Sequence, residues 1–201
     1  MLNNEKKVYL FEYKLSIVRF EILVIAILGF TIIAGTVSQA FAASDYFLKI
    51  EGVDGESKDK AHPNEIQLES WSFGASQSGS MAMGGGGGAG KVVMQDFHFT
   101  KSVDKSSPKL FEALATGQHL KEAKLVLRSA GGSQVEYMVI TLSDVLVSSY
   151  STSGSSGEDR PTESISFSFS QIKMRYVGQD EKGAPGAAVE FGWDLKTNKK
   201  V

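Results

Sequence analysis

The chain has 201 residues, with 21 Lys and Arg side chains against 23 Asp and Glu side chains, and its formal net charge is −2. A charge balance this close to neutral offers no basic surface for nucleic acid or anionic lipid. The sequence contains no cysteine, which excludes disulfide bonds, thiol catalysis and cysteine-ligated metals.

The N-terminal segment has the three parts of a secretory signal peptide. Basic residues come first, residues 22–43 then contain no charged side chain, and the small-residue sequence AFA ends at Ala42. This order predicts export, with cleavage after Ala42. An uncleaved membrane helix is the alternative, because about 20 apolar residues can span a bilayer. We therefore divide the chain into residues 1–42, a signal peptide or membrane anchor, and residues 43–201, one folded domain.

Alternation of apolar and polar residues dominates from residue 44 onward. Tyr46, Leu48 and Ile50 share one face of a predicted strand, and the same two-residue period recurs in residues 133–142 and 188–195. The period changes phase within residues 65–73 and within residues 164–177. Such a slip indicates a bulge or a change of buried face, which is how sheets bend to close. We therefore predict a mainly β domain, a small barrel or sandwich.

One short helix is predicted between the strands. Ser107 is a candidate N-cap and is followed by a proline, which suits the first helical turn, and Gly117 is placed to end the helix. Leu110, Phe111 and Leu114 recur at helical spacing. The helix is therefore one-sided, and we expect it to cover part of the sheet structure.

A glycine-rich run raises the possibility of a nucleotide site. Residues 84–92 read GGGGGAGKV, the opening of the Walker phosphate-binding pattern. The hydroxyl residue that should follow Lys91 is Val92, and the residues after it alternate like a strand. A true phosphate loop leaves a buried strand and enters a helix. We therefore interpret the glycines as a loop free to adopt backbone angles closed to other residues, and predict no cofactor.

Residue patterns for catalysis are absent from the sequence. The three histidines are far apart, and no second ligand stands at metal-binding spacing. Ser78 and Ser153 lie in polar loops without the Gly-x-Ser-x-Gly turn of a hydrolase. We therefore predict no catalytic residue and no metal site, and do not expect an enzyme.

Serines instead line one face of several predicted strands. Ser70 and Ser72 alternate with Trp71 and Phe73, and residues 166–170 repeat this arrangement. One face is then core, and the other is small, neutral and hydroxylated. Such a face suits a smooth wall or a close interface, although an ordinary solvent-facing strand is the alternative.

Long stretches of the sequence also resemble a known family. The run WSFGASQSGSMAMGGGGGAGKVVMQDFHFTKSVDKSSPKLF is similar to the signature of the haemolysin-coregulated proteins (Hcp), the tube subunits of bacterial type VI secretion. LKIEGVDGESKDKAH and FGWDLKTNKK continue the match, which covers residues 44–200. The resemblance implies a β-barrel of two antiparallel sheets with one short α-helix, assembled as a hexameric ring. Rings stack into a hollow tube that a sheath propels, with small effectors in the lumen and tip proteins at the end.

The resemblance also implies functional positions. Ser72 becomes a candidate lumen or effector contact, and the loop of residues 77–91 a candidate ring or stacking contact. The candidate inter-subunit residues are Gln77, Ser78, Met81, Met83, Gly86, Gly88 and Lys91.

The N-terminal segment departs from the family pattern. Tube-building members are cytoplasmic before secretion and need no signal peptide, whereas residues 1–42 predict passage through the periplasm to the exterior. If the translation start is mis-assigned, the segment is not part of the protein, which is then cytoplasmic before secretion. However, no Met lies between Met1 and Met81. Two functions therefore stay open: a type VI secretion tube subunit, and an exported Hcp-like binding module or effector carrier that builds no tube.

Overall fold

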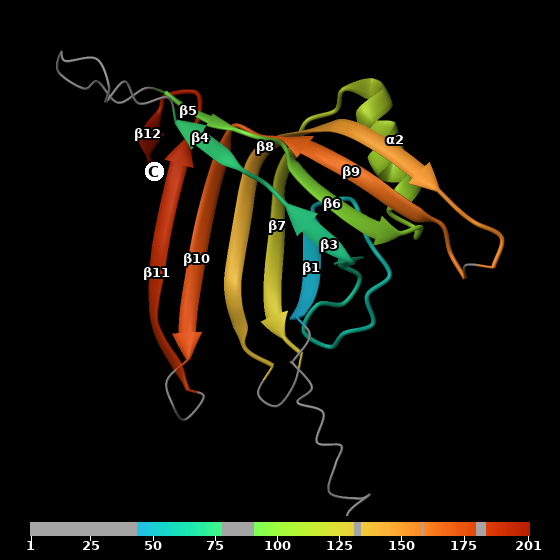
Figure 1. Cartoon of the computed structure of the whole chain (residues 1–201), viewed down its shortest axis with the longest axis horizontal. Coiled ribbons are helices and arrows are strands. Elements are labelled where there is room, and N and C mark those ends of the chain that lie inside the picture. The colour runs from blue at the N-terminus through green and yellow to red at the C-terminus, as the bar shows by residue number, and fades with distance from the viewer. Residues whose placement is uncertain (1–43, 78–90, 131–133, 158, 180–183) are drawn as a thin grey trace, which may run out of the picture. The chain divides into compact units, whose positions relative to one another are not determined.

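A computed structural model describes residues 44–77, 91–130, 134–157, 159–179 and 184–201 (Figure 1). The segment of residues 1–42 and the run of glycines lie outside these ranges, so the signal peptide and the domain boundary after Ala42 stay predictions. Within the described ranges, no helix has the length and apolarity needed to cross a membrane.

The described residues form a mainly β domain with one helix. Its elements are β1 (Ser44–Ile50), β2 (Ile66–Leu68), β3 (Ser70–Ser72), β4 (Ala75–Gln77), β5 (Val92–Met94), β6 (Phe97–Ser102), α2 (Ser107–Thr116), β7 (Leu120–Ser129), β8 (Glu136–Ser153), β9 (Thr162–Ser168), β10 (Gln171–Gln179), β11 (Pro185–Asp194) and β12 (Lys199–Lys200).

Two antiparallel sheets make the barrel. The first has the strand order β12-β11-β10-β8-β7-β1-β2, and the second runs β3-β6-β9-β8. The long strand β8 belongs to both sheets (Figure 1). Strand β2 leads through Glu69 directly into β3, so the two sheets are joined along both sides. Strands β4 and β5 form a separate two-stranded ribbon. The predicted fold class is confirmed.

Both predicted phase slips are places where the chain changes sheet. Leu68 pairs with Tyr46 of β1, whereas Ser70, two residues later, pairs with Thr100 of β6. Likewise β9 ends in the second sheet at Ser168, and β10 begins in the first sheet at Gln171. The buried face changes because each strand moves to a sheet that approaches the core from the other side.

Strand β8 makes a third change of sheet, which the sequence pattern did not reveal. Its buried side chains move from Ile140 and Leu142 to Val145 and Val147, on the opposite phase. Between them, Asp144 adopts a φ of 54°, in the left-handed region. Aspartate tolerates this conformation better than most residues, so one residue bends the strand from one sheet into the other.

The core lies between the two sheets and is rich in phenylalanine. Phe97, Phe99 and Phe167 are fully buried, and the rings of Phe99 and Phe167 meet edge to face with centroids 4.9 Å apart. Leu48 and Ile50 of β1 are buried as predicted. Phe47, on the other face of β1, is buried as well, because His62 of the loop after β1 stacks on its ring.

Two expectations about the helix were wrong. The N-cap is Ser106 rather than Ser107, which is the first helical residue. Leu110 is fully buried, but Phe111 is 55% exposed, and its ring meets that of Tyr150 in a T-shaped contact. Successive residues lie about 100° apart around a helix, and the buried stripe of this helix runs through Ser107, Leu110 and Ala113, so Phe111 lies beside it. Gly117 does end the helix, with a left-handed φ of 65°.

Candidate functional site

The outward face of the second sheet carries hydroxyl side chains at most positions, together with His98 and with Leu146, which pairs with Ser168. We call this surface the hydroxyl wall. Its residues are Ser70 and Ser72 of β3, His98, Thr100 and Ser102 of β6, Thr162, Ser164 and Ser166 of β9, and Ser149, Ser151 and Ser153 of β8.

Strand register aligns these side chains in rows across the sheet. His98 pairs with Ser72 on one side and with Ser166 on the other, and Ser166 pairs with Ser149. In the next row the hydroxyls of Ser70 and Thr100 lie 2.7 Å apart. None of the wall's hydroxyls carries a charge at neutral pH.

His98 lies within the wall and is bonded to β9 through both ring nitrogens. Its Nδ1 is 3.0 Å from Ser166 Oγ, and its Nε2 is 3.1 Å from Ser164 Oγ. A neutral imidazole has one donor and one acceptor, so one serine accepts a hydrogen bond from the ring and the other donates one. The ring is thereby fixed along β9.

The structure places the predicted site residues in two regions. Ser72 is exposed on the hydroxyl wall. Gln77 ends β4, and Lys91 directly precedes Val92, its cross-strand partner. Gln77 and Lys91 therefore meet at one end of the ribbon, as expected for the two ends of a loop. The other candidate inter-subunit residues, Ser78, Met81, Met83, Gly86 and Gly88, lie outside the described residues.

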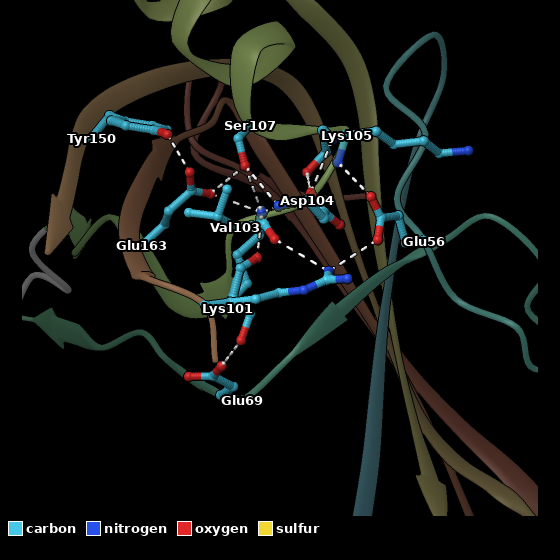
Figure 2. Close-up of polar contacts among 12 residues, drawn as sticks. Glu56, Glu69, Lys101, Val103, Asp104, Lys105, Ser107, Tyr150 and Glu163 are labelled. Carbon is cyan, nitrogen blue, oxygen red and sulfur yellow. Dashed lines mark hydrogen bonds and ion pairs between the residues drawn. The ribbon is translucent and has the colours of Figure 1, made fainter. Parts of the chain in front are cut away.

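A buried ion-pair network holds the start of α2 to the second sheet (Figure 2). The Lys101 side chain is fully buried, and its Nζ lies 2.8 Å from Glu163 Oε2 and 2.8 Å from Asp104 Oδ1. It also donates to Ser107 Oγ at 3.1 Å. The sequence contained a signal for this network, because Lys101 continues the alternation of Phe97 and Phe99 and so falls on the core face of β6.

Tyr150 extends this network to the surface of α2. Its hydroxyl donates to Glu163, whose second carboxylate oxygen accepts a hydrogen bond from Ser107 Oγ at 2.8 Å (Figure 2). Burial, followed by the contact with Glu163, raises the pKa of Tyr150 to about 12, so the phenol stays protonated and remains a donor at neutral pH. Phe111 rests edge-on against the Tyr150 ring.

A polar pocket of ≈ 420 Å³ lies beside the same network, between the loop after β1 and β6. Glu56 of that loop accepts hydrogen bonds from Arg160 Nη1 at 3.0 Å and from the backbone nitrogen of Lys105 at 3.2 Å (Figure 2). On its other side, Ser102 donates to Glu69 at 2.6 Å. These contacts fasten two long loops and the edge of the hydroxyl wall together.

Strands β10 and β11 extend the first sheet beyond the barrel and expose an apolar face. We call this pair of strands the wing and its apolar surface the wing face. The wing face consists of the cross-strand pairs Met174–Phe191 and Tyr176–Val189, with Trp193. Val189 is 69% exposed and Tyr176 is 50% exposed. The sequence pattern of residues 188–195 predicted a strand correctly, but most of its apolar side has no core to cover it.

An open apolar groove of ≈ 420 Å³ separates the wing from the ribbon. Met174, Phe191 and Trp193 line it from the wing, and Phe73 and Met94 line it from the opposite side. The groove is therefore aromatic along much of its length. Such a recess can receive an apolar side chain from another molecule.

The three histidines lie in separate environments. His62 Nδ1 is 3.0 Å from Glu65, and His98 contacts only serines of the wall through its ring nitrogens. His119 Nδ1 is 2.6 Å from Asp144, whose pKa is lowered to about 2, first by its hydrogen bond from Lys196 and then by that from His119. Among the described residues, no group of three or more His, Asp or Glu is placed to hold a metal ion.

The domain therefore exposes two contrasting surfaces, the hydroxyl wall and the apolar wing face, and an exposed apolar surface of this kind is typical of contacts with another molecule. Comparison with known proteins gives the family. The family model described as "Type VI secretion system effector, Hcp" matches residues 47–176. The chain therefore belongs to the Hcp family of type VI secretion tube and effector proteins.

Individual relatives agree with this assignment. Protein hcp1 of Pseudomonas aeruginosa strain PAO1 is 55% identical over 158 residues, which cover 78% of this chain and 98% of the relative. A solved structure of a type six secretion system protein superposes with a TM-score of 0.75 at 35% identity, covering 79% of this chain and 100% of the other. Hcp1 from Salmonella typhimurium gives a TM-score of 0.67 at 39% identity, covering 79% and 99%.

Proposed function

We propose that this protein is a tube subunit that assembles into a closed hexameric ring, with the hydroxyl wall lining the lumen. The observation that carries the proposal is the contrast between two surfaces of one domain. The wall presents small hydroxylated side chains at nearly every position, whereas the wing face presents large apolar ones. The wing face suits permanent contact between subunits, and the wall suits passage of other molecules.

The neutral wall supports a role in carrying effectors. Short uncharged hydroxyls hold a passing protein weakly, because each hydrogen bond made to that protein replaces a hydrogen bond made to water. Ser72 lies on this wall and becomes a lumen contact in the assembled ring. In this proposal the loop of residues 77–91 contacts the next ring in the stack, and sheath and tip proteins contact the assembled tube.

The proposed activity is assembly and secretion rather than catalysis. Members of the family are structural, secreted proteins of type VI secretion, and we propose that this chain leaves the cell by that route. The predicted signal peptide at residues 1–42 would bring the domain to the periplasm instead. Secretion from cells lacking the type VI apparatus distinguishes the routes, because general export continues without it.

Single cysteines test the position of the wall, since the chain has no cysteine of its own. Ser72→Cys places a thiol on the wall, and Lys124→Cys places one on the outward face of the first sheet, where Lys124 is exposed. In the assembled protein, purified from cells expressing the full chain, both cysteines should react with a small maleimide. A maleimide carried on a folded protein too large for the lumen should label only the cysteine at 124.

Two results would contradict the proposal. Equal labelling of both cysteines by the bulky reagent would place Ser72 on the outside of the assembly. A single-protomer mass for the unmodified protein, measured by light scattering across a wide concentration range, would rule out ring formation and favour the exported binding module. Electron microscopy of the same sample shows directly whether rings are present.

A further inference from the structure

Closing a ring places a geometric demand on the subunit. A head-to-tail ring joins two different surfaces of the same protomer, so every subunit needs a pair of complementary patches facing in different directions. The wing face can supply one patch. The residues that form the second patch can be sought among the remaining exposed apolar side chains of the described domain.

Among the residues that the structure describes, the large hydrophobic side chains exposed outside the wing face are Val93, Phe111 and Val201. Val93 lies on β5, whose neighbouring residues line the groove beside the wing. The backbone nitrogen of Val201 donates to Gly192 of β11 at 3.2 Å, so this residue also belongs to the wing side. Phe111 alone among them lies on α2, across the domain from β11 (Figure 1).

We propose that Phe111 of one protomer inserts against the wing face of the next protomer, in the groove lined by Met174, Phe191 and Trp193. The proposal rests on the ring assembly proposed above and names the two surfaces that form its junction. An aromatic side chain entering an apolar recess is the usual centre of a tight interface. Phe111 supplies the aromatic side chain and the groove supplies the recess.

The buried network fixes Phe111 in position before assembly. Phe111 contacts the ring of Tyr150, Tyr150 donates to Glu163, and Glu163 is paired with Lys101. A side chain already held in place loses less conformational entropy on binding than a mobile one. The network therefore anchors the helix that carries the exposed Phe111.

Two single substitutions separate the two halves of the junction. Val189→Asp places a charge on the wing face at a side chain that is 69% exposed, and Phe111→Asp places one on the helix patch at a side chain that is 55% exposed. Both proteins should be single protomers by light scattering, because each ring junction contains one damaged patch. Mixed in equal amounts, they should form a heterodimer, since one keeps an intact helix patch and the other an intact wing face.

Matched controls use neighbouring positions that point elsewhere. Glu190→Ala changes the opposite face of β11, where Glu190 pairs with Arg175 at 3.1 Å. Lys109→Glu changes α2 about 200° around the helix from Phe111, and Lys109 is also exposed. Both controls should assemble like the unmodified protein. Phe111→Ala serves as a second helix variant, and circular dichroism confirms that each protein is folded.

Specific outcomes overturn the pairing. If Phe111→Asp and Phe111→Ala both form normal rings, the helix does not take part in the junction. If folded Val189→Asp and Phe111→Asp stay single protomers on mixing, they are not the two halves of one junction. If Phe111→Asp alone forms a dimer, the wing face pairs with itself. If the unmodified protein is itself a single protomer, that result contradicts the proposed ring assembly and not the choice of Phe111 and the wing face as contacts.

Discussion

The buried network of Lys101 gives the sharpest test of how the fold is held together. Lys101→Met keeps most of the side-chain volume but removes the ammonium group that lies 2.8 Å from both Glu163 and Asp104. Glu163 is 1% exposed and Asp104 10% exposed, so two carboxylates lose their cation where water cannot replace it. Breaking a buried ion pair by removing one partner costs about 3–5 kcal/mol.

A loss of this size is a large part of the stability of a domain, which is about 5–15 kcal/mol. Urea unfolding should therefore show a much lower midpoint for Lys101→Met with an unchanged slope. The double variant Lys101→Met with Glu163→Gln should be more stable than the sum of the single effects predicts, by about 2 kcal/mol, because the neutral amide no longer needs the cation. Lys109→Met, which removes an exposed pair on α2, should cost less than about 1 kcal/mol. If Lys101→Met costs no more than this control, the network does not stabilise the fold.

Three further predictions follow from single sites. Hydrogen bonding from Arg128 holds the pKa of Asp59 well below its usual 3.8. This pair therefore stabilises the fold fully above about pH 4, and its contribution falls as the pH drops further. Asp59→Asn should reduce the difference between the unfolding midpoints measured at pH 7 and at pH 3. Asp144→Val should lower the thermal midpoint more than Asp144→Asn, because a β-branched residue resists the left-handed φ of 54° that asparagine accepts. Ser72→Glu should leave the light-scattering mass of the assembly unchanged, since Ser72 lies on the hydroxyl wall and outside the proposed junction; a loss of assembly would place the wall in the subunit contact.

The changes of sheet show how far the sequence pattern can predict this fold. Two of them are visible because the apolar residues shift phase between Leu68 and Trp71, and again between Phe167 and Ile172. The third, at Asp144, was missed. Apolar residues stand on both phases before and after it, as in Val139 and Ile140 and in Val145 and Leu146, so no phase shift stands out. A left-handed backbone angle at an aspartate has no fixed signature in the sequence. Barrel closure could be predicted, but not every corner that achieves it.

The candidate site was predictable only where side-chain alternation is informative. The serines opposite Trp71 and Phe73 indicated a hydroxylated face, and the structure extends it across four strands. The rows that join His98 to Ser164 and Ser166 depend on strand pairing between segments more than 60 residues apart, as in the contact between His98 and Ser166. Register of this kind is set by the whole sheet and not by either segment alone.

The wing face shows why a strand can be predicted correctly and its surroundings cannot. Val189, Phe191 and Trp193 alternate as core residues do, because burial against any apolar surface selects the same side chains. The part of the domain that the structure describes provides no such surface for Val189, which is 69% exposed. If the Phe111 junction is correct, the apolar side chains of β11 become buried only when a second copy of the chain docks on them. Val189→Asp should then cost little in the unfolding free energy of a single protomer while abolishing assembly, and a large loss of protomer stability would instead mean that the wing face is already covered within one chain.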